Sequence, residues 1–532
     1  MWNRRLTVRN TSTLFIVVIA VAVVAALLLR WVDLASQSLW ADEGHTLWMS
    51  RFSPRELLSA LKWDTSAPLY FVLLHYWTNL LGDSEFSLRS LSALFATLSI
   101  PLLLFVAREI LVDRTSVALV MLLYAVNCFQ VWYARETRFY ALLGFLSLAS
   151  VCCVLLWLKG HNWSALGGLV LSLGAALYTH NTSFFYLPGI AIMWFVYPSE
   201  RSFRSRLANG LGVAFFVLFL YAPWVPMLRE QMQRVREFFW VSRPGAKQLL
   251  DSLCILSGFD IPTLQHAFRD QLHLHISRLF GFWTWSPAIL GAFLLCVVSS
   301  VSAPRVADRR KITAVLAYLA FPIILIFVDS RISIPVYTNK VFVGSSALLP
   351  IIFCAPIAIQ AGTSRKLATV LGILIFFGTT LSCFGYLRRE RREDWRGVTE
   401  HLLSIPEKQR LVVVVPDYAQ ILVDYYAGRL SKSFRPSEIT GLLTQYHPPD
   451  QTFQMRIRQN WAHGCVLCDL EKDFASGDYR EIDVAINPGT LRELVKPTLD
   501  FISGHCASVQ TTDFNKLEVK ECQLQATPAP RP

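Results

Sequence analysis

The feature that most constrains this chain is a series of long apolar runs separated by short polar segments. A helix needs about 20 mostly apolar residues to cross the hydrocarbon core of a bilayer. Runs of about this length lie near residues 13–31, 88–107, 115–133, 139–158, 164–179, 183–197, 208–226, 282–302, 312–328, 341–361 and 367–387. The sequence therefore predicts an all-α polytopic membrane domain of about eleven transmembrane helices.

The composition agrees with a membrane protein. Only 17% of the 532 residues are charged and 53% are hydrophobic, with a mean hydropathy of +0.40, whereas soluble proteins carry about 25% charged residues. The net charge of +12 comes mostly from lysine and arginine clusters between the apolar runs. Such clusters set membrane topology, so we expect no nucleic-acid partner.

The positions of these basic clusters predict the orientation. If the N-terminus is cytoplasmic, the loops that hold Arg108 with Arg114, Lys159, and Arg365 with Lys366 are all cytoplasmic. An odd number of spans then places the C-terminus outside. The run Ala67–Leu81 is short and contains His75, and counting it as a span would reverse every later loop, so we predict an interfacial helix there. The outer loops are then residues 32–87 and 227–281, and the second begins with a basic and aromatic segment typical of headgroup level.

The composition changes near residue 388, which predicts two domains, a transmembrane domain at 1–387 and an extracytoplasmic soluble domain at 388–532. Residues 411–415 (LVVVV) and 481–487 (EIDVAIN) resemble strands, and a helical pattern follows the first. We therefore predict a small α/β domain. Its four cysteines, an even number outside the cytoplasm, predict disulfides of open pairing, although Cys465-x-x-Cys468 also fits a zinc half-site or a redox motif. They are Cys465, Cys468, Cys506 and Cys522.

Two adjacent carboxylates, Asp42 and Glu43, lie in the first outer loop between Trp40 and Trp48. A carboxylate at an apolar interface is suited to act as a general base, because burial raises its pKa toward the working range. The alternative is a solvated loop or a helix N-terminus, where acidic residues are favoured by the helix dipole. Asp64, in the same loop, fits a helix N-cap or a third functional carboxylate.

Other polar residues lie at predicted outer helix ends. Glu136 and Arg138 are charged at membrane depth, so they either pair or face a cavity, and Arg138 has the donors to hold a phosphate. His180 fits a satisfied interfacial histidine as well as a site residue. Lys340 either extends to the interface or meets a lipid phosphate, and the sequence leaves both open.

An ordered set of motifs runs through the chain, and any single one is weak. In order they are SLWADEG (38–44), DTSAPLYFVLLHYW (64–77), GDSEFSLRSLSALFA (82–96), YARETRFYALL (133–143), LYTHN (177–181), YAPWVP (221–226), PVYTNKVFV (335–343) and EDWR (393–396). Together they resemble the bacterial branch of the dolichyl-phosphate-mannose protein mannosyltransferase family in the GT-C glycosyltransferase superfamily. The relatives include the enzyme that transfers aminoarabinose to lipid A.

The resemblance implies roles for individual residues. Asp42 matches the family's catalytic aspartate of the first outer loop, and Glu43 follows as its companion. Asp64 matches a motif usually seen as Asp-x-His-Pro-Pro, but Ser66 and Ala67 replace the histidine and the first proline, so any role that needs that histidine, including metal binding, lacks its residue here. Glu136, Arg138 and Tyr140 match the Glu-x-Arg-x-Tyr pattern, and Lys340 stands where relatives often have arginine.

The implied activity is transfer of a sugar from a polyprenyl-phosphate donor to a lipid A, polysaccharide or protein acceptor, with inversion, at the outer face of the cytoplasmic membrane. Asp42 would take the acceptor proton, and Arg138, Lys340 and Arg89 would stabilise the leaving phosphate. Membrane lipids are further expected partners. No cofactor is assigned, and a divalent metal is left open.

Two alternatives come from other classes of protein. A transporter or flippase of lipid-linked sugars would be expected to place ionisable residues near the bilayer midplane, whereas here they gather at helix ends. A scaffold would act through its soluble domain alone. The sequence does not name the sugar, the acceptor or the lipid chain length.

Overall fold

The computed structural model describes residues 2–62, 64–160, 163–237, 241–259, 282–303, 305–360, 362–388, 392–404, 410–415, 419–430, 439–441, 481–487, 500 and 503–524. The chain divides into two units. Unit 1 comprises residues 1–34, 64–82 and 86–389, and unit 2 comprises residues 35–63, 83–85 and 390–532. Most of the first outer loop thus belongs with the C-terminal part of the chain.

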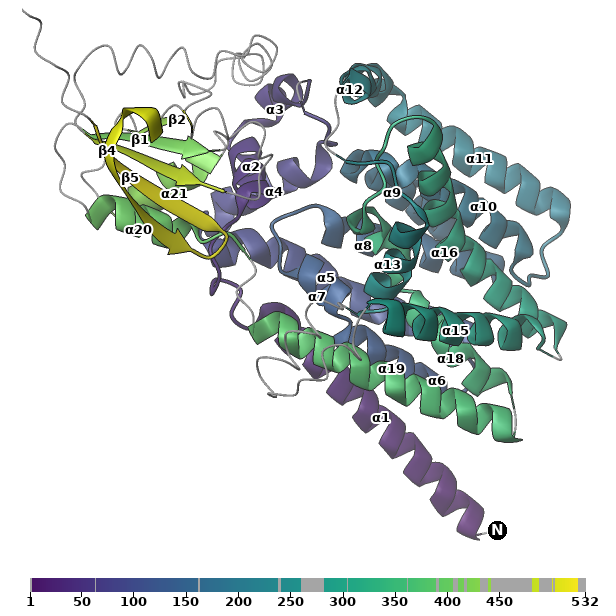
Figure 1. Ribbon diagram of the computed structural model, residues 1–532. Helices are drawn as coiled ribbons and strands as arrows, with labels where there is room; N and C mark the ends of the chain where they lie inside the picture. Colours follow the sequence, from purple (N-terminus) through teal and green to yellow (C-terminus); the bar gives the residue numbers. More distant parts are fainter. Residues whose placement is uncertain are drawn as a thin grey trace, which may run out of the picture. The chain divides into compact units, whose positions relative to one another are not determined.

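Unit 1 is helical (Figure 1). Its α-helices are α1 (Trp2–Trp31), α4 (Leu69–Leu81), α5 (Glu85–Ile110), α6 (Arg114–Val126), α7 (Cys128–Ala134), α8 (Tyr140–Leu158), α9 (Trp163–Thr179), α10 (Leu187–Val196), α11 (Phe203–Tyr221), α12 (Val225–Glu237), α13 (Ala246–Leu256), α15 (Phe282–Val301), α16 (Val306–Ile332), α17 (Val343–Ser346), α18 (Leu349–Ile359) and α19 (Gly362–Arg388). Short 3₁₀ helices are η1 (Asn181–Tyr186), η2 (Ala222–Trp224) and η5 (Asn339–Phe342). The first residue of α5 belongs to unit 2.

Each predicted apolar run coincides with one helix or with two or three consecutive helices. Among the described residues, seven helices are long and apolar enough to span a membrane, and the bent pair α6–α7 makes an eighth. The helices at three other predicted positions, Trp163–Thr179, Asn181–Val196 and Ile289–Val301, are shorter but apolar. A polytopic membrane domain is confirmed, whereas the count of eleven spans remains a prediction. The run at 67–81 forms the 13-residue helix α4, as expected from its short length.

The bend between α6 and α7 has a local cause at Asn127. This residue has an extended backbone (φ −61°, ψ 109°), and its side-chain oxygen accepts a hydrogen bond from the Gln130 amide at 3.0 Å. Asn127 therefore starts a new helix instead of continuing α6, and the two axes differ by 53°. The turn after α7 then carries Glu136 and Arg138.

Burial differs sharply between helices of unit 1. In α8, 78% of the most apolar window is buried inside the protein, compared with 17% in the span that contains α11. The large side chains that α11 exposes include Leu211, Phe215 and Phe219. Exposed apolar side chains are what a lipid-facing helix requires. Helix α8 is therefore a core element, and its first residue, Tyr140, is a predicted site residue.

Unit 2 combines helices with a five-stranded mixed sheet (Figure 1). The helices are α2 (Ala41–Ser50), α3 (Pro54–Leu61), α20 (Trp395–Ser404) and α21 (Gln420–Leu430), and the strands are β1 (Arg410–Val415), β2 (Ile439–Gly441), β3 (Glu481–Ile486), β4 (Cys506–Phe514) and β5 (Leu517–Leu524). The strand order is β2-β1-β3-β5-β4. Strand β1 pairs in parallel with β2 and β3, whereas β5 is antiparallel to β3 and β4. The two strands predicted from sequence are β1 and β3.

Candidate functional site

The turn between α7 and α8 in unit 1 holds two predicted site residues. Glu136 is 2% exposed and Arg138 is 8% exposed. The indole nitrogen of Trp132 donates to Glu136 Oε1 at 2.5 Å, and the Arg138 guanidinium lies 4.7 Å from the centre of the Phe139 ring. The Arg138 carbonyl accepts from Ser92 Oγ at 3.1 Å, so α5 fixes the backbone of this turn.

His180 and two further predicted residues, Tyr140 and Lys340, lie at the same place. Its ring centre lies 6.2 Å from that of Tyr140, and Lys340 Nζ lies 5.7 Å from the Tyr140 ring centre. His180 lies between α9 and η1, outside the helices that qualify as spans. Burial, with the nearby positive charges of Lys340 and Arg138, lowers the pKa of His180 to about 3. We call Arg138, Tyr140, His180 and Lys340 the cationic cluster.

The hydrogen bonds of His180 define its tautomer. The Thr182 amide donates to His180 Nδ1 at 3.1 Å, so Nδ1 is the acceptor nitrogen and the proton of the neutral ring belongs on Nε2. A neutral imidazole with this arrangement offers one N–H donor. It therefore contributes a hydrogen bond but no positive charge to the cationic cluster at neutral pH.

Asp64 shapes the loop before α4. Its Oδ1 accepts hydrogen bonds from the amides of Thr65 and Ser66, the second at 2.8 Å. The N-cap position of α4 is occupied by Pro68, so Asp64 closes a turn and does not cap that helix. The expectation of an N-cap was therefore wrong, because the chain makes a turn of several residues before the helix begins.

Two side chains that the sequence reasoning gave no role join this turn to the neighbouring elements. Asn181 Nδ2 donates to the Thr65 carbonyl at 2.9 Å and to Gln231 Oε1 at 3.0 Å, and Gln231 Nε2 donates to the Ser66 carbonyl at 3.0 Å. Gln231 is only 1% exposed. The motif LYTHN contained Asn181, whereas Gln231 had no signal beyond its place in a basic amphipathic segment.

Arg89 has a different environment from the cationic cluster. It is 1% exposed, and its Nη1 donates to the Leu34 carbonyl at 2.6 Å, just after the end of α1. Arg135 is similar, since it donates to the carbonyls of Leu29 and Asp33 at 3.1 and 3.0 Å. Arg135 therefore contacts the last turn of α1, where cations stabilise the helix dipole, and both guanidinium groups contact carbonyls just after that helix.

In unit 2, Asp42 and Glu43 lie in the first turn of α2. Glu43 is fully buried and pairs with Arg392, whereas Asp42 is half-buried. Ala41 donates its amide to Glu393 Oε2 at 3.3 Å. Burial raises the pKa of Glu393, and the negative charge of Asp42 adds to that rise. The motif EDWR therefore contacts the motif SLWADEG inside one unit.

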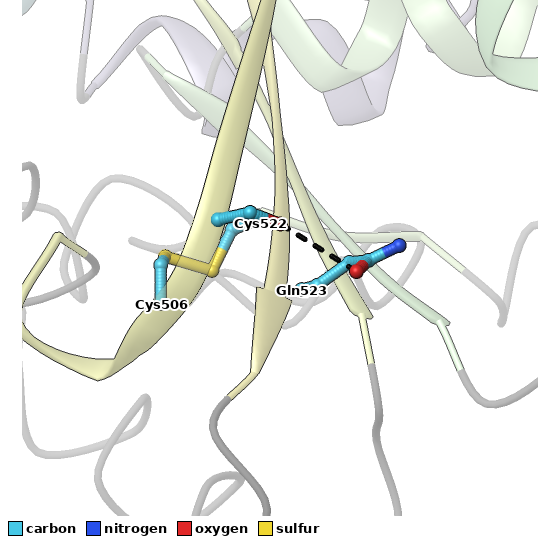
Figure 2. Close-up of a disulfide and its surroundings, with 4 residues drawn as sticks. Cys506, Cys522 and Gln523 are labelled. Carbon is cyan, nitrogen blue, oxygen red and sulfur yellow. Dashed lines mark hydrogen bonds between the residues drawn. A yellow bond between two sulfur atoms is a disulfide. The ribbon is translucent and has the colours of Figure 1, made fainter.

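The structure joins Cys506 to Cys522 in a disulfide that links β4 to β5, with a Cα–Cα distance of 5.5 Å (Figure 2). Cys465 and Cys468 lie outside the described residues, so their pairing stays a prediction. Within the described ranges, no group of three or more His, Cys, Asp or Glu side chains is placed to hold a metal ion.

Comparison with known proteins agrees with this picture. Residues 65–226 match the family model described as dolichyl-phosphate-mannose-protein mannosyltransferase. The chain is similar in fold to ArnT from Cupriavidus metallidurans bound to undecaprenyl phosphate, with a TM-score of 0.53 and 14% identity over 96% of this chain and 99% of ArnT. For ArnT in the apo state the TM-score is 0.54 with 14% identity, over 97% and 98% of the two chains.

A weaker match is the S. cerevisiae protein O-mannosyltransferase Pmt1-Pmt2 complex bound to the sugar donor. Its TM-score is 0.33 with 18% identity, over 46% of this chain and 36% of that one. A search of curated proteins found no match. The resemblance predicted from the ordered motifs is thus confirmed: this is a membrane protein similar to the dolichyl-phosphate-mannose-protein mannosyltransferases over residues 65–226, with a fold similar to that of ArnT over nearly its whole length.

Proposed function

We propose that this protein is a membrane glycosyltransferase that moves a sugar from a polyprenyl-phosphate donor to an acceptor at the outer face of the cytoplasmic membrane. The observation that carries the proposal is the cationic cluster. The Arg138 guanidinium lies over the Phe139 ring and Lys340 Nζ over the Tyr140 ring, and the His180 ring contacts both of these rings. Two cations in such surroundings suit a phosphate that is attached to a lipid.

The match to ArnT supports a phosphate ligand. That protein was solved with undecaprenyl phosphate, and it shares its fold with this chain. Arg138 and Lys340 would hold the phosphate, and the Nε2 proton of His180 would add a neutral hydrogen bond. Arg89 is assigned to the support of α1, because its guanidinium already contacts the Leu34 carbonyl.

The reaction needs one base. An acceptor O–H or N–H would lose its proton to the Asp42 carboxylate while the acceptor atom bonds to the anomeric carbon. The bond from that carbon to the phosphate oxygen breaks at the same time, and the lipid phosphate leaves with the electron pair. A single displacement inverts the anomeric centre, so retention in the product would contradict this mechanism. Glu43 is buried and paired with Arg392, so Asp42 is the stronger candidate for the base.

The disulfide supports the orientation. Disulfides persist mainly in oxidising compartments, which favours an extracytoplasmic position for the Cys506–Cys522 hairpin and for the rest of unit 2. Asp42 belongs to the same unit. The topology inferred from the basic loops places both on the outer side as well.

The test compares cells that produce the wild type, Asp42→Asn or Glu56→Gln, and cells without the protein. Mass spectrometry of surface lipids and glycans should detect a sugar-sized mass difference with the wild type and with Glu56→Gln, whose side chain only caps α3. Asp42→Asn should abolish it, by at least about 1,000-fold in rate, because the proton has no other acceptor. Near wild-type transfer by folded Asp42→Asn would refute the role of Asp42.

The rival reading, a flippase of lipid-linked sugars, makes a different prediction in the same cells. No sugar would be attached to any acceptor, and Asp42→Asn would leave the surface lipids unchanged. Purified protein that binds undecaprenyl phosphate without ever producing a sugar-sized mass shift on candidate acceptors would favour that reading.

A further inference from the structure

The segment 35–43 of unit 2, which carries Asp42, is bound on both sides of that residue by parts of the chain more than 300 positions away. The residues responsible are Arg392, Glu393, Arg396 and Tyr426, which we call the clamp. Arg392 and Glu393 contact the residues directly after and before Asp42, and Arg396 and Tyr426 contact the stretch that leads to α2.

Glu393 is itself held by three donors. Its Oε2 accepts from the Ala41 amide at 3.3 Å and from the Trp395 indole nitrogen at 2.6 Å, and its Oε1 accepts from Asn487 Nδ2 at 2.7 Å. Trp395 is fully buried at the start of α20, and Asn487 follows β3. The position of the Ala41 amide is thus tied to the sheet.

Arg392 is fixed by the turn between β4 and β5. Its carbonyl accepts from Asn515 Nδ2 at 2.6 Å, and the Asp394 amide donates to the Asn515 carbonyl at 3.2 Å. The guanidinium of Arg392 pairs with the fully buried carboxylate of Glu43. The residue after Asp42 is therefore connected to a hairpin that the Cys506–Cys522 disulfide closes.

Tyr426 and Arg396 hold the stretch before α2. The Leu39 amide donates to the Tyr426 hydroxyl at 2.7 Å, and that hydroxyl donates to Glu85 Oε1 at 2.5 Å. Arg396 donates from its amide to Ser38 Oγ at 3.1 Å and from Nη2 to the Ala35 carbonyl at 3.1 Å. Arg396 Nη2 also pairs with Glu85. Glu85 thus joins the two clamp residues.

We propose that the clamp is a positioning device for Asp42, so that the C-terminal part of the chain is a working part of the catalytic apparatus. The inference rests on the proposed function, in which Asp42 is the base. A base must be held within a few tenths of an ångström of its productive place, and a short segment bound only at its ends would not hold it there. Backbone bonds at Leu39 and Ala41 and the ion pair at Glu43 restrict the segment on both sides of Asp42.

The experiment uses full-length protein in detergent with three variants. Tyr426→Phe removes the hydroxyl that links Leu39 to Glu85. Glu393→Gln removes the negative charge of the side chain that accepts a hydrogen bond from the Ala41 amide. Tyr425→Phe is the matched control, because the Tyr425 hydroxyl donates to the Asp83 carbonyl at 3.0 Å, which lies outside the segment 35–43. The readouts are transfer rate, affinity for undecaprenyl phosphate, and hydrogen exchange of residues 38–48.

Tyr426→Phe and Glu393→Gln should each lower the transfer rate about 10- to 100-fold and speed exchange of residues 38–48. The affinity for undecaprenyl phosphate should stay within about twofold of wild type, since the cationic cluster belongs to unit 1. Tyr425→Phe should match the wild type in all three readouts. Loss of undecaprenyl phosphate affinity in step with rate would indicate general damage and overturn the proposal.

A pH profile separates positioning from mere stability. Asp42 and Lys516 are two charged groups whose charges act on Glu393. Removing the negative charge in Glu393→Gln makes ionisation of Asp42 easier, so the acid limb of the rate should move to lower pH. An unmoved limb with unchanged exchange would refute the clamp, whereas an active Asp42→Asn would instead refute the proposed function.

Discussion

The two units hold their candidate residues in different ways. In unit 1 the cations lie against aromatic rings, as Arg138 does with Phe139 and Lys340 with Tyr140. In unit 2 the carboxylates contact groups of opposite charge or amide donors, as Glu43 does with Arg392. A ring leaves a cation with its positive charge, whereas an ion pair neutralises both partners. The two candidate cations of unit 1 thus lie over aromatic rings, whereas the Glu43 carboxylate of unit 2 forms an ion pair that fixes a segment of the chain.

The strongest way to break this comparison is to remove one half of the buried pair. Arg392→Gln leaves the fully buried Glu43 carboxylate without that partner, which should destabilise unit 2 by about 3–5 kcal/mol. The measurement is pulse proteolysis of full-length protein in urea, with detection of C-terminal fragments.

Two controls sharpen this result. The double variant Glu43→Met with Arg392→Met should recover most of the loss, because no charge is then buried. Lys159→Gln removes an exposed partner of Glu109 in unit 1, and such pairs contribute less than about 1 kcal/mol. Equal losses from Arg392→Gln and Lys159→Gln would show that the two units do not differ in this way.

The two units also differ in how much of them could be predicted. The spans of unit 1 depend on local hydrophobicity, and the ends of its helices carry the polar residues that the motifs mark. The grouping of Arg138, His180 and Lys340 was expected only as a shared outer position. Their proximity depends on packing of α8, η1 and η5, which no local pattern encodes.

Unit 2 is assembled from pieces far apart in the sequence. The strand patterns at 411–415 and 481–487 were readable because β1 and β3 are short and apolar. The contact between SLWADEG and EDWR could not be predicted from the sequence, because it depends on side-chain hydrogen bonds between residues about 350 positions apart. The motif EDWR was identified only through its resemblance to the family. For Tyr426 the sequence predicted a helix and no functional role.

A second prediction concerns Asp424 of unit 2, whose carboxylate differs in its surroundings from the ion-paired carboxylate of Glu43. Both carboxylate oxygens of Asp424, on α21, are buried with no hydrogen-bond partner among the described residues. Burial raises the pKa of Asp424 to about 7, against a smaller opposite effect from Arg51. The folded state therefore binds this proton more tightly than the unfolded state does. The contribution of Asp424 to the free energy of unfolding is therefore fully present below about pH 4. It is lost as the pH rises to about 7.

Asp424→Asn should remove that dependence. At pH 8 the variant should be more stable than the wild type by about 2 kcal/mol, a value below the full shift because the surrounding protein and water relax around a buried charge. Near pH 4 the two proteins should be equally stable. Urea unfolding at both pH values measures this, with Asp513→Asn, on the exposed part of β4, as control. A difference that did not grow with pH would show that Asp424 is ionised in the folded protein.

The smallest expected effect lies in unit 1 and concerns whether His180 carries a charge. Because its pKa is lowered to about 3, His180 should stay neutral between pH 5 and pH 8 and should act only as a donor. His180→Gln should lower transfer about tenfold, a loss of about 1.4 kcal/mol, without changing the shape of the pH–rate profile. If the wild type instead showed an inflection near pH 6.5 that His180→Gln removed, the histidine would be titrating. Burial of the His180 ring, the largest cause of its lowered pKa, would then be incomplete in the working protein.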